Sequence, residues 1–275
     1  MGDDGSARGR DPEADRLRGN RSWRVETPGG PALQKLYCER TGAVAALVRE
    51  ILIAVARTKT SQRPRARRAT ERELLALWRE RGFDVPRDRT DELPQFGAPD
   101  VALFEFVEDA TPLWDLLADR RVTRDARDDL LRRFAAAWGR RHAEALRTND
   151  ARLVQEHGSV RHVLVAGDRL VWIDLEQAFR PRGDVRPLLA KEIAGYLRSV
   201  RKRANDDDWP RDVAAIADGH PDPRVLRAAC DEYLVPRGAK RLLWAADRAI
   251  RNPRRRREKY GALESMDAEL RRRGL

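Results

Sequence analysis

Hydrophobic and polar residues alternate along two stretches of the chain, and each stretch predicts a β-hairpin. Residues 22–38, SWRVETPGGPALQKLYC, read as two strands around a Pro-Gly-Gly turn, because proline fixes φ and glycine accepts a positive φ between alternating apolar positions. Two shorter strands are expected at residues 163–165 and 170–173, around an Ala-Gly-Asp turn. Residues 101–106 also alternate and predict a strand that leads into a short helix near Thr111.

Apolar residues at helical spacing dominate most of the remaining chain. Residues 69–82, ATERELLALWRERG, follow a basic, proline-containing loop at residues 58–68 and predict an amphipathic helix that stops at Gly82. Its apolar face holds Leu74, Leu77 and Trp78. A longer helix is expected at residues 125–146, with one apolar face made of Leu130, Leu131, Phe134, Trp138 and Ala145.

Further helical patterns occur both before and after these segments. Residues 42–56 predict a helix packed on the core, and residues 188–203, 223–233 and 239–251 predict three more, before a charged, arginine-rich helix at the C-terminus. A small mixed N-terminal part followed by a mostly helical C-terminal part is an α+β architecture.

The expected organisation has three parts. Residues 1–20 lack an apolar core, so they are not a secretory signal and are expected to form a disordered leader. Residues 21–108 form the mixed part and residues 109–275 the helical part, which ends in the basic helix.

Composition narrows the classes of partner and compartment. The 56 basic residues exceed the 45 acidic ones, which gives a net charge of +11 and favours anionic partners such as nucleotides, nucleic acids or acidic membrane surfaces. Cys38 and Cys230 lie too far apart in sequence to indicate a disulfide framework or a zinc site, which fits a reducing cytosol. The apolar run at residues 42–56 is short and carries Arg49 and Glu50, so no transmembrane helix is predicted.

Phosphoryl transfer from ATP requires a lysine on the phosphates and an acid that holds this lysine. Lys35 lies near the end of the second strand of the first hairpin, where it can point towards a cleft, although a lysine on a strand is usually only solvated. Glu71 opens the following amphipathic helix and can reach back to pair with Lys35. Glu73 competes for this role, but two residues apart on a helix the two side chains face different directions.

A metal ion must also be held, and the second hairpin offers ligands. Asp174 follows the apolar strand RLVWI, where a carboxylate can present both oxygens to a metal, or equally well close an ordinary turn. His162 precedes the first strand of this hairpin, twelve residues before Asp174. The hairpin would bring the two side chains together, in a spacing that suits a shared metal site.

The order of these residues resembles the protein-kinase-like fold, and most of all the lipopolysaccharide core kinase family, the Kdo and heptose kinases. The resemblance rests on Lys35, on Glu71, and on the segments HGSVRHVLV, IDLEQAF and KEIAGYLRSVRK, and it covers roughly residues 23–202. His162 stands where ordinary protein kinases have an asparagine, and an Ile-Asp-Leu motif contains Asp174.

This resemblance implies a bilobal protein-kinase-like fold, with a small mixed N-lobe and a mainly helical C-lobe. It implies that Lys35 contacts the α- and β-phosphates of ATP, that Glu71 pairs with Lys35, and that His162 and Asp174 hold Mg²⁺. The backbone from Glu105 to Val107 would meet the adenine. The implied activity is an ATP-dependent phosphotransferase that moves the γ-phosphate to a sugar, glycolipid or other hydroxyl acceptor.

The catalytic loop departs from the family pattern. The position of the catalytic aspartate, five residues before His162, is occupied by His157, and Glu156 is one residue out of place. A histidine with its ordinary pKa near 6.5 can accept a proton at neutral pH, so His157 is the candidate base. The chain also lacks a G-x-G-x-x-G loop near the first hairpin, where Gly29 and Gly30 do not form one.

Two alternatives remain open at this stage. Because His157 replaces an acid, the chain can instead be a catalytically impaired, kinase-like protein that binds nucleotide for regulation. The basic segments at residues 254–257, 271–273 and 64–68 favour a weaker alternative, a nucleic-acid-binding protein. The same basic loops would also suit a cytoplasmic protein that contacts the anionic inner face of a membrane, where a glycolipid acceptor would lie.

Overall fold

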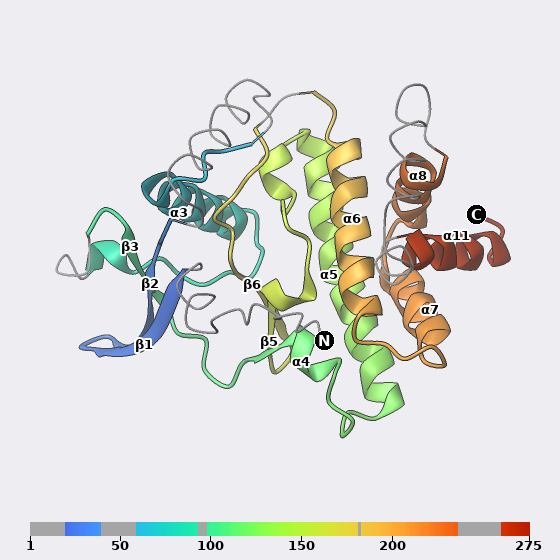
Figure 1. The fold of residues 1–275 in the computed structure, drawn as a ribbon, viewed down its shortest axis with the longest axis horizontal. Coiled ribbons are helices and arrows are strands. Elements are labelled where there is room, and N and C mark those ends of the chain that lie inside the picture. The colour runs from blue at the N-terminus through green and yellow to red at the C-terminus, as the bar shows by residue number, and fades with distance from the viewer. Residues whose placement is uncertain (1–19, 40–58, 93–97, 181–182, 236–259) are drawn as a thin grey trace, which may run out of the picture.

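The computed structural model describes residues 20–39, 59–92, 98–180, 183–235 and 260–275, and these form a mixed α and β protein (Figure 1). The described residues hold seven α-helices and two three-stranded antiparallel sheets. The predicted α+β class is therefore confirmed. The helices predicted at residues 42–56 and 239–251, and nearly all of the predicted leader, lie outside the described residues.

The first sheet has the strand order β1-β2-β3, and its first two strands form the predicted hairpin. Strands β1 (Arg21–Thr27), β2 (Gly30–Leu36) and β3 (Val101–Glu105) pair antiparallel, and Gly30 takes a φ of 94° at the turn, which an L side chain rarely adopts. Lys35 pairs with Ser22 on one side and Ala102 on the other. Alternation along β2 places Lys35 on the same face of the sheet as Leu33.

Helix α3 (Pro64–Glu80) begins earlier than the sequence pattern predicts. Its first turn contains residues that were expected to form a basic loop, and the reason is Pro64, whose fixed φ and missing N–H suit the first position of a helix. The apolar face buries Leu74 and Trp78 as predicted. The helix ends at Glu80, and Gly82 follows with a φ of 77°.

The second sheet differs from the prediction at its edge. Strands β5 (Val163–Ala166) and β6 (Arg169–Trp172) form the predicted hairpin, and β4 (Thr111–Pro112) joins β5. Thr111 was expected to begin a helix, but the residue before a proline is driven to extended backbone, so Thr111 pairs with Val165 instead. The short helix α4 (Leu113–Leu116) begins directly after this strand.

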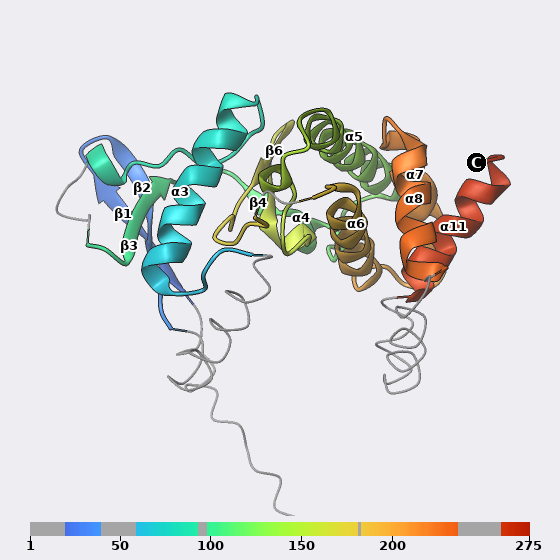
Figure 2. The same cartoon turned by 90° about the horizontal axis from the view of Figure 1, so that it is seen from above.

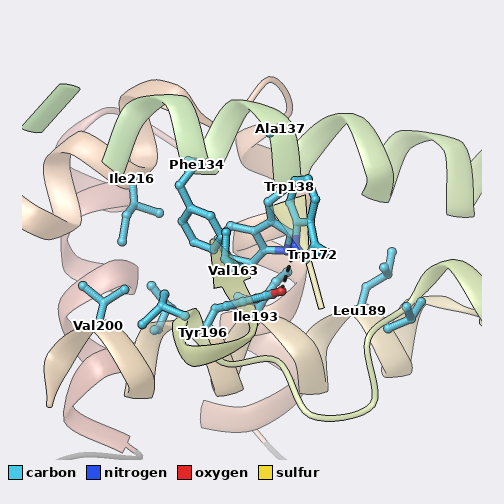
Figure 3. Close-up of a cluster of buried hydrophobic side chains, with 14 of the residues drawn as sticks. Phe134, Ala137, Trp138, Val163, Trp172, Leu189, Ile193, Tyr196, Val200 and Ile216 are labelled. Carbon is cyan, nitrogen blue, oxygen red and sulfur yellow. Dashed lines mark hydrogen bonds between the residues drawn. The ribbon is translucent and has the colours of Figure 1, made fainter. Parts of the chain in front are cut away.

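The helical part is built around two long helices that lie side by side in both views (Figures 1 and 2). Helix α5 (Arg124–Thr148) is capped by the Thr123 side chain at its start and by Asn149 in the left-handed conformation at its end. Helix α6 (Arg186–Arg201) packs against α5 through aromatic rings (Figure 3). The centre of the Tyr196 ring lies 5.0 Å from the centre of the Phe134 ring and 5.1 Å from that of Trp138.

Three further helices complete the described chain. Helices α8 (Pro223–Leu234) and α11 (Ala262–Arg272) agree with the predicted pattern, whereas α7 (Trp209–Gly219) was missed. Helix α7 is short, and its apolar residues lie between stretches rich in Asp, Asn, Gly and Pro, which are typical of loops. It packs on α5.

The first sheet and α3 lie at one end of the molecule, the helices α5 to α8 and α11 lie at the other, and the second sheet lies between them (Figure 2). Several hydrogen bonds tie these parts together; for example, the Trp78 ring nitrogen donates to the Arg152 carbonyl at 2.9 Å, and the Trp172 amide donates to the Asp84 carbonyl at 2.9 Å. Among the described residues, no helix is long and apolar enough to cross a membrane.

Candidate active site

A cavity of about 580 Å³ lies between the first sheet and the β5–β6 hairpin. Its size falls in the range of about 300–1,000 Å³ that is typical of small-molecule sites. Its walls include six of the seven residues predicted for the site: Lys35, Glu71, Glu105, Val107, His162 and Asp174. Apolar side chains such as Leu33, Leu75 and Phe104 line the same space. The fold therefore gathers residues that are far apart in the sequence around one volume.

Lys35 is the centre of the charged wall. Its ammonium group donates to Glu71 Oε2 at 2.8 Å and to Asp174 Oδ1 at 2.8 Å, and Glu176 Oε2 lies 3.7 Å away. Burial alone would lower the pKa of Lys35, but these three carboxylates outweigh it and raise the pKa above its usual value. Lys35 is therefore a permanent cation in the free protein, held at the cavity wall.

The orientation of helix α3 determines which glutamate reaches Lys35. Glu71 is buried, and its Oε2 also accepts a hydrogen bond from the Tyr37 hydroxyl at 2.5 Å. Glu73 lies on another face of the helix and pairs with Arg152 at 3.1 Å. The choice that the sequence left open is thus settled in favour of Glu71 as the ion-pair partner.

Glu176 belongs to the same cluster, although it was not singled out from the sequence. It is buried, accepts a hydrogen bond from the Asn20 side chain, and lies 3.6 Å from Arg67. Carboxylate oxygens of Glu71, Asp174 and Glu176 all lie within 4.8 Å of one another, a grouping that could hold a metal ion. The available signal was an acid two residues after Asp174, close to the end of the apolar strand, since a buried acid must have a partner.

Asp174 occupies a backbone conformation that costs free energy. Its φ is 62°, in the left-handed region, where the structure places few residues other than glycine. This conformation directs one oxygen to Lys35 and the other towards His162, whose Nε2 lies 3.5 Å from Asp174 Oδ2. Strained residues of this kind concentrate at functional sites, where the surrounding structure holds them in place.

The ring of His162 is oriented for use as a ligand. Its Nδ1 lies 3.2 Å from the carbonyl oxygen of His157, and a carbonyl can only accept, so Nδ1 carries the hydrogen. In the neutral ring the lone pair is then on Nε2, the nitrogen that faces Asp174. Burial lowers the pKa of His162 below its ordinary value, which keeps the ring neutral at pH 7. The predicted pair of His162 and Asp174 is therefore brought together in a state that can bind a cation.

His157 lies beside the cavity and does not line it. Its side chain is 60% exposed, and Nε2 lies 2.7 Å from Oε2 of the buried Glu156. Burial would raise the pKa of Glu156, but His157, Lys191 and Lys59 lower it well below its usual value, so Glu156 is ionised. The carboxylate of Glu156 therefore lies within ion-pair distance of the imidazole of His157, without a hydrogen bond of good geometry between them among the described residues.

The segment after β3 provides backbone groups at the cavity. The Glu105 amide donates to the Arg87 carbonyl at 2.8 Å, so it is already used. Among the hydrogen bonds of the described residues, none involves the backbone of Val107, which lines the cavity two residues later. Val107 can therefore offer both an N–H and a C=O to a flat, hydrogen-bonding ligand.

No protein-family model matches this chain, and no curated protein matches it.

Proposed function

We propose that this protein is an ATP-dependent phosphotransferase with a protein-kinase-like, bilobal fold. The observation that carries the proposal is the position of Lys35, held by Glu71 at 2.8 Å and by Asp174 at 2.8 Å at the wall of a 580 Å³ cavity. Phosphoryl transfer depends on positioning and charge neutralisation, and a buried lysine fixed by an acid is one of its recurring parts. The small lobe would be the first sheet with α3, and the large lobe the helical part.

The cavity supports a nucleotide in two ways. Its inner walls are apolar at Leu33, Leu75 and Phe104, which suits a flat purine base, and the free backbone groups of Val107 suit the polar edge of that base. Lys35 lines the same cavity beside Glu71 and Asp174, where the phosphates of ATP would meet it.

The residues present also fit a divalent cation. Asp174 offers a carboxylate and His162 a neutral nitrogen, and Glu176 adds a second carboxylate nearby. Mg²⁺ prefers oxygen ligands, so Asp174 would be its principal ligand and His162 the weaker one. In the free protein Asp174 is paired with Lys35. When Mg²⁺ is bound it supplies charge neutralisation for the phosphates.

His157 would act as the base that accepts the proton of the acceptor hydroxyl. The ionised Glu156 lies 2.7 Å from one nitrogen of the imidazole, where its charge would stabilise the protonated ring that forms when His157 takes up the proton. The side chain of His157 is 60% exposed, so an acceptor such as a sugar or glycolipid hydroxyl can approach it. Such help is worth about 10²- to 10⁴-fold in rate.

The test is a phosphotransfer assay with purified full-length protein, Mg²⁺ and γ-labelled ATP, with sugars as acceptors and water as the background acceptor. Wild-type protein is expected to release or transfer labelled phosphate, and Asp174→Asn to lose at least about 100-fold of this rate. Asparagine tolerates the left-handed conformation of Asp174, so this variant keeps the fold while it loses the charge. Asp129→Asn, at an exposed site on α5, is the matched control.

Two further outcomes are informative. If Mg²⁺ and ATP raise the melting temperature of wild-type protein but no phosphate moves, the chain is a nucleotide-binding regulatory protein. If neither binding nor turnover is detected for wild-type protein, the proposal is wrong. His157→Ala should lower the transfer rate by about 100-fold or more without loss of ATP-dependent stabilisation, and an unchanged rate would remove His157 from the mechanism.

A further inference from the structure

A second cavity, of about 390 Å³, lies on the other side of the loop that carries His157 and His162. Its lining is strongly basic: Arg161, Arg198, Lys202 and Arg203 contribute to its walls, together with the hydroxyl groups of Ser159 and Ser199. Among the described residues, no acidic side chain lines it. The positive charges of Arg161, Arg198 and Arg203 in one concave surface repel one another, and a bound anion would relieve this repulsion.

The arginines of this cavity have no acidic partners within the described residues. Most arginines on α5 and α11 form ion pairs, for example Arg133 with Asp129 at 3.0 Å. By contrast, among the residues that the structure describes, no carboxylate pairs with Arg161, Arg198 or Arg203. The Nε of Arg203 is covered and lacks a hydrogen-bond acceptor in the same described set.

Trp114 holds two of these guanidinium groups in place. The Arg161 guanidinium lies 3.9 Å from the centre of the Trp114 ring, and the Arg203 guanidinium lies 3.8 Å from it. Stacking on an aromatic ring fixes the plane of a guanidinium without consuming its N–H donors. The donors of both groups thus remain available to a ligand in a nearly preformed geometry.

The loop between the two cavities is rigidly attached to α6. A Cβ at Gly158 would meet the Glu192 carbonyl at 2.7 Å, and a Cβ at Gly195 would meet the Gly158 carbonyl at 2.6 Å. These contacts are possible because both residues are glycines. The loop therefore packs directly against the helix that carries Arg198, and the Val160 amide also donates to Ser199 Oγ of that helix at 2.9 Å.

We infer that the basic cavity binds a phosphate group of the acceptor, so that the acceptor is itself an anionic, phosphorylated molecule. Arginine recognises phosphate through paired N–H donors, and Ser159 and Ser199 add hydroxyl groups at the same wall. The binding of phosphate stands on this cavity alone. The identification of its owner as the acceptor rests on the proposed function, because His157 and Gly158 are neighbours in the loop.

The direct test is calorimetric titration of inorganic pyrophosphate into the full-length protein at low ionic strength. The variant Arg161→Gln/Arg198→Gln removes two charges from exposed positions, and glutamine keeps the helix propensity of α6. We expect the dissociation constant to rise at least about 10-fold in this variant. The control Arg65→Gln/Arg140→Gln removes the same charge from exposed positions on α3 and α5 and should bind as wild type does. Equal weakening in both variants, or no binding to wild type, would overturn the inference.

A second comparison distinguishes binding at one cavity from binding at the other. Lys35→Met should retain pyrophosphate binding and lose stabilisation by ATP, whereas Arg161→Gln/Arg198→Gln should show the reverse. If ATP fails to bind wild-type protein but pyrophosphate still requires Arg161 and Arg198, the proposed function fails and the anion site remains. If pyrophosphate binding disappears in Lys35→Met, the phosphate site is the larger cavity and the inference is wrong.

The source of the phosphate is decided by competition. A hexose phosphate that displaces pyrophosphate indicates a soluble acceptor, and vesicles that contain phosphatidic acid, bound by wild type but not by the double variant, indicate a lipid headgroup. An oligonucleotide that binds equally well to wild type and to the double variant binds to a surface elsewhere on the chain. If wild-type protein binds this oligonucleotide but none of the phosphate compounds or vesicles, the inference is wrong.

Discussion

Among the buried groups of ion pairs in the described residues, one in the helical core and one at the large cavity differ in how completely they are closed. In the core, Glu192 receives Arg141 at 2.7 Å and lies 2.9 Å from His142, and all three side chains are 0% exposed. At the cavity, Lys35 and Glu71 are buried in the same way, but Asp174 is 32% exposed and has a φ of 62°.

This difference separates charges that support the fold from charges that can serve a ligand. The core group is closed to solvent, with the Gln155 backbone amide also donating to Glu192 at 2.9 Å. Arg141 Nε and His142 Nδ1 find no hydrogen-bond partner among the described residues, but no ligand can reach them there. The cavity group has three carboxylates, in Glu71, Asp174 and Glu176, against two cations, the Lys35 ammonium and the Arg67 guanidinium, and the carboxylate of Asp174 is strained and open. A cation or a phosphate–cation pair would relieve this imbalance. The imbalance is the physical mark of a binding site.

The largest effect is expected when the closed group is broken. Glu192→Ala leaves Arg141 buried without a counter-charge, and removing one partner of a buried pair costs about 3–5 kcal/mol. We therefore expect the free energy of unfolding to fall by that amount in urea denaturation at pH 7. Asp129→Asn, which breaks the exposed pair with Arg133, should change it by less than about 1 kcal/mol and serves as the control. A loss below 1 kcal/mol for Glu192→Ala would show that the core group is not closed.

The next effect concerns the open group, where function should fall more than stability. Lys35→Met removes the ammonium group, but Glu71 keeps its hydrogen bond from Tyr37 and can take up a proton to become neutral. We therefore expect the free energy of unfolding to fall less than in Glu192→Ala. Phosphate transfer or release should drop at least about 100-fold. Urea unfolding and transfer of labelled phosphate, measured in parallel, distinguish the two roles of Lys35. A large loss of stability without a loss of transfer would show that Lys35 is a structural residue.

The pH dependence of stability distinguishes the closed region in another way. Burial lowers the pKa of His220 from 6.5 to about 3, and it also lowers the pKa of His142. A folded-state pKa below the unfolded value means that the unfolded chain binds more protons, so stability is complete above pH 6.5 and falls as the pH drops towards 3.

For His220 this loss amounts to about 2 kcal/mol between pH 6.5 and pH 5. The paired carboxylates contribute little there, because their loss of stability begins nearer to the ordinary pKa of Glu, about 4.3. Urea titrations of wild-type protein and His220→Gln at pH 7 and pH 5 measure the difference, and the variant should lose about 2 kcal/mol less. Identical pH dependence in the two proteins would place His220 in contact with solvent.

Features that depend on a few neighbouring residues could be predicted from the sequence, whereas features that depend on distant residues mostly could not. Local periodicity was sufficient for the hairpins and for α5, because turn chemistry and apolar spacing act within a few residues. The pairing of Lys35 with Glu71, and of His162 with Asp174, followed from chain order and hairpin geometry. The kinase-like interpretation stays a prediction from motif order.

Features that depend on the assembled fold were not predictable. Glu176 joined the cluster only because the chain after β6 turns inward beside Arg67 and Asn20. The ionised state of Glu156 required Lys59 and Lys191 to meet it from distant positions. The basic cavity arose because α6 and Trp114 meet at one loop, and no local pattern indicates such a meeting.

The smallest expected effect lies on α3, where two glutamates stand two positions apart and only one belongs to the open group. Glu73→Gln removes a largely exposed partner of Arg152, and a surface pair of this kind contributes about 0–1 kcal/mol. Arg152 also keeps its pair with Asp150 at 2.7 Å. We therefore expect a change in the free energy of unfolding below 1 kcal/mol, an unchanged transfer rate and unchanged stabilisation by ATP.

Glu71→Gln is the matched comparison, because it makes the same chemical change on the same helix. It replaces the carboxylate that holds Lys35 at 2.8 Å with a neutral amide, so Lys35 should bind Asp174 and Glu176 more tightly and be less available to phosphate. ATP-dependent stabilisation and the transfer rate, measured for both variants, should therefore fall for Glu71→Gln and not for Glu73→Gln. Equal effects of the two substitutions would mean that the rotation of α3 does not select the residue that positions Lys35.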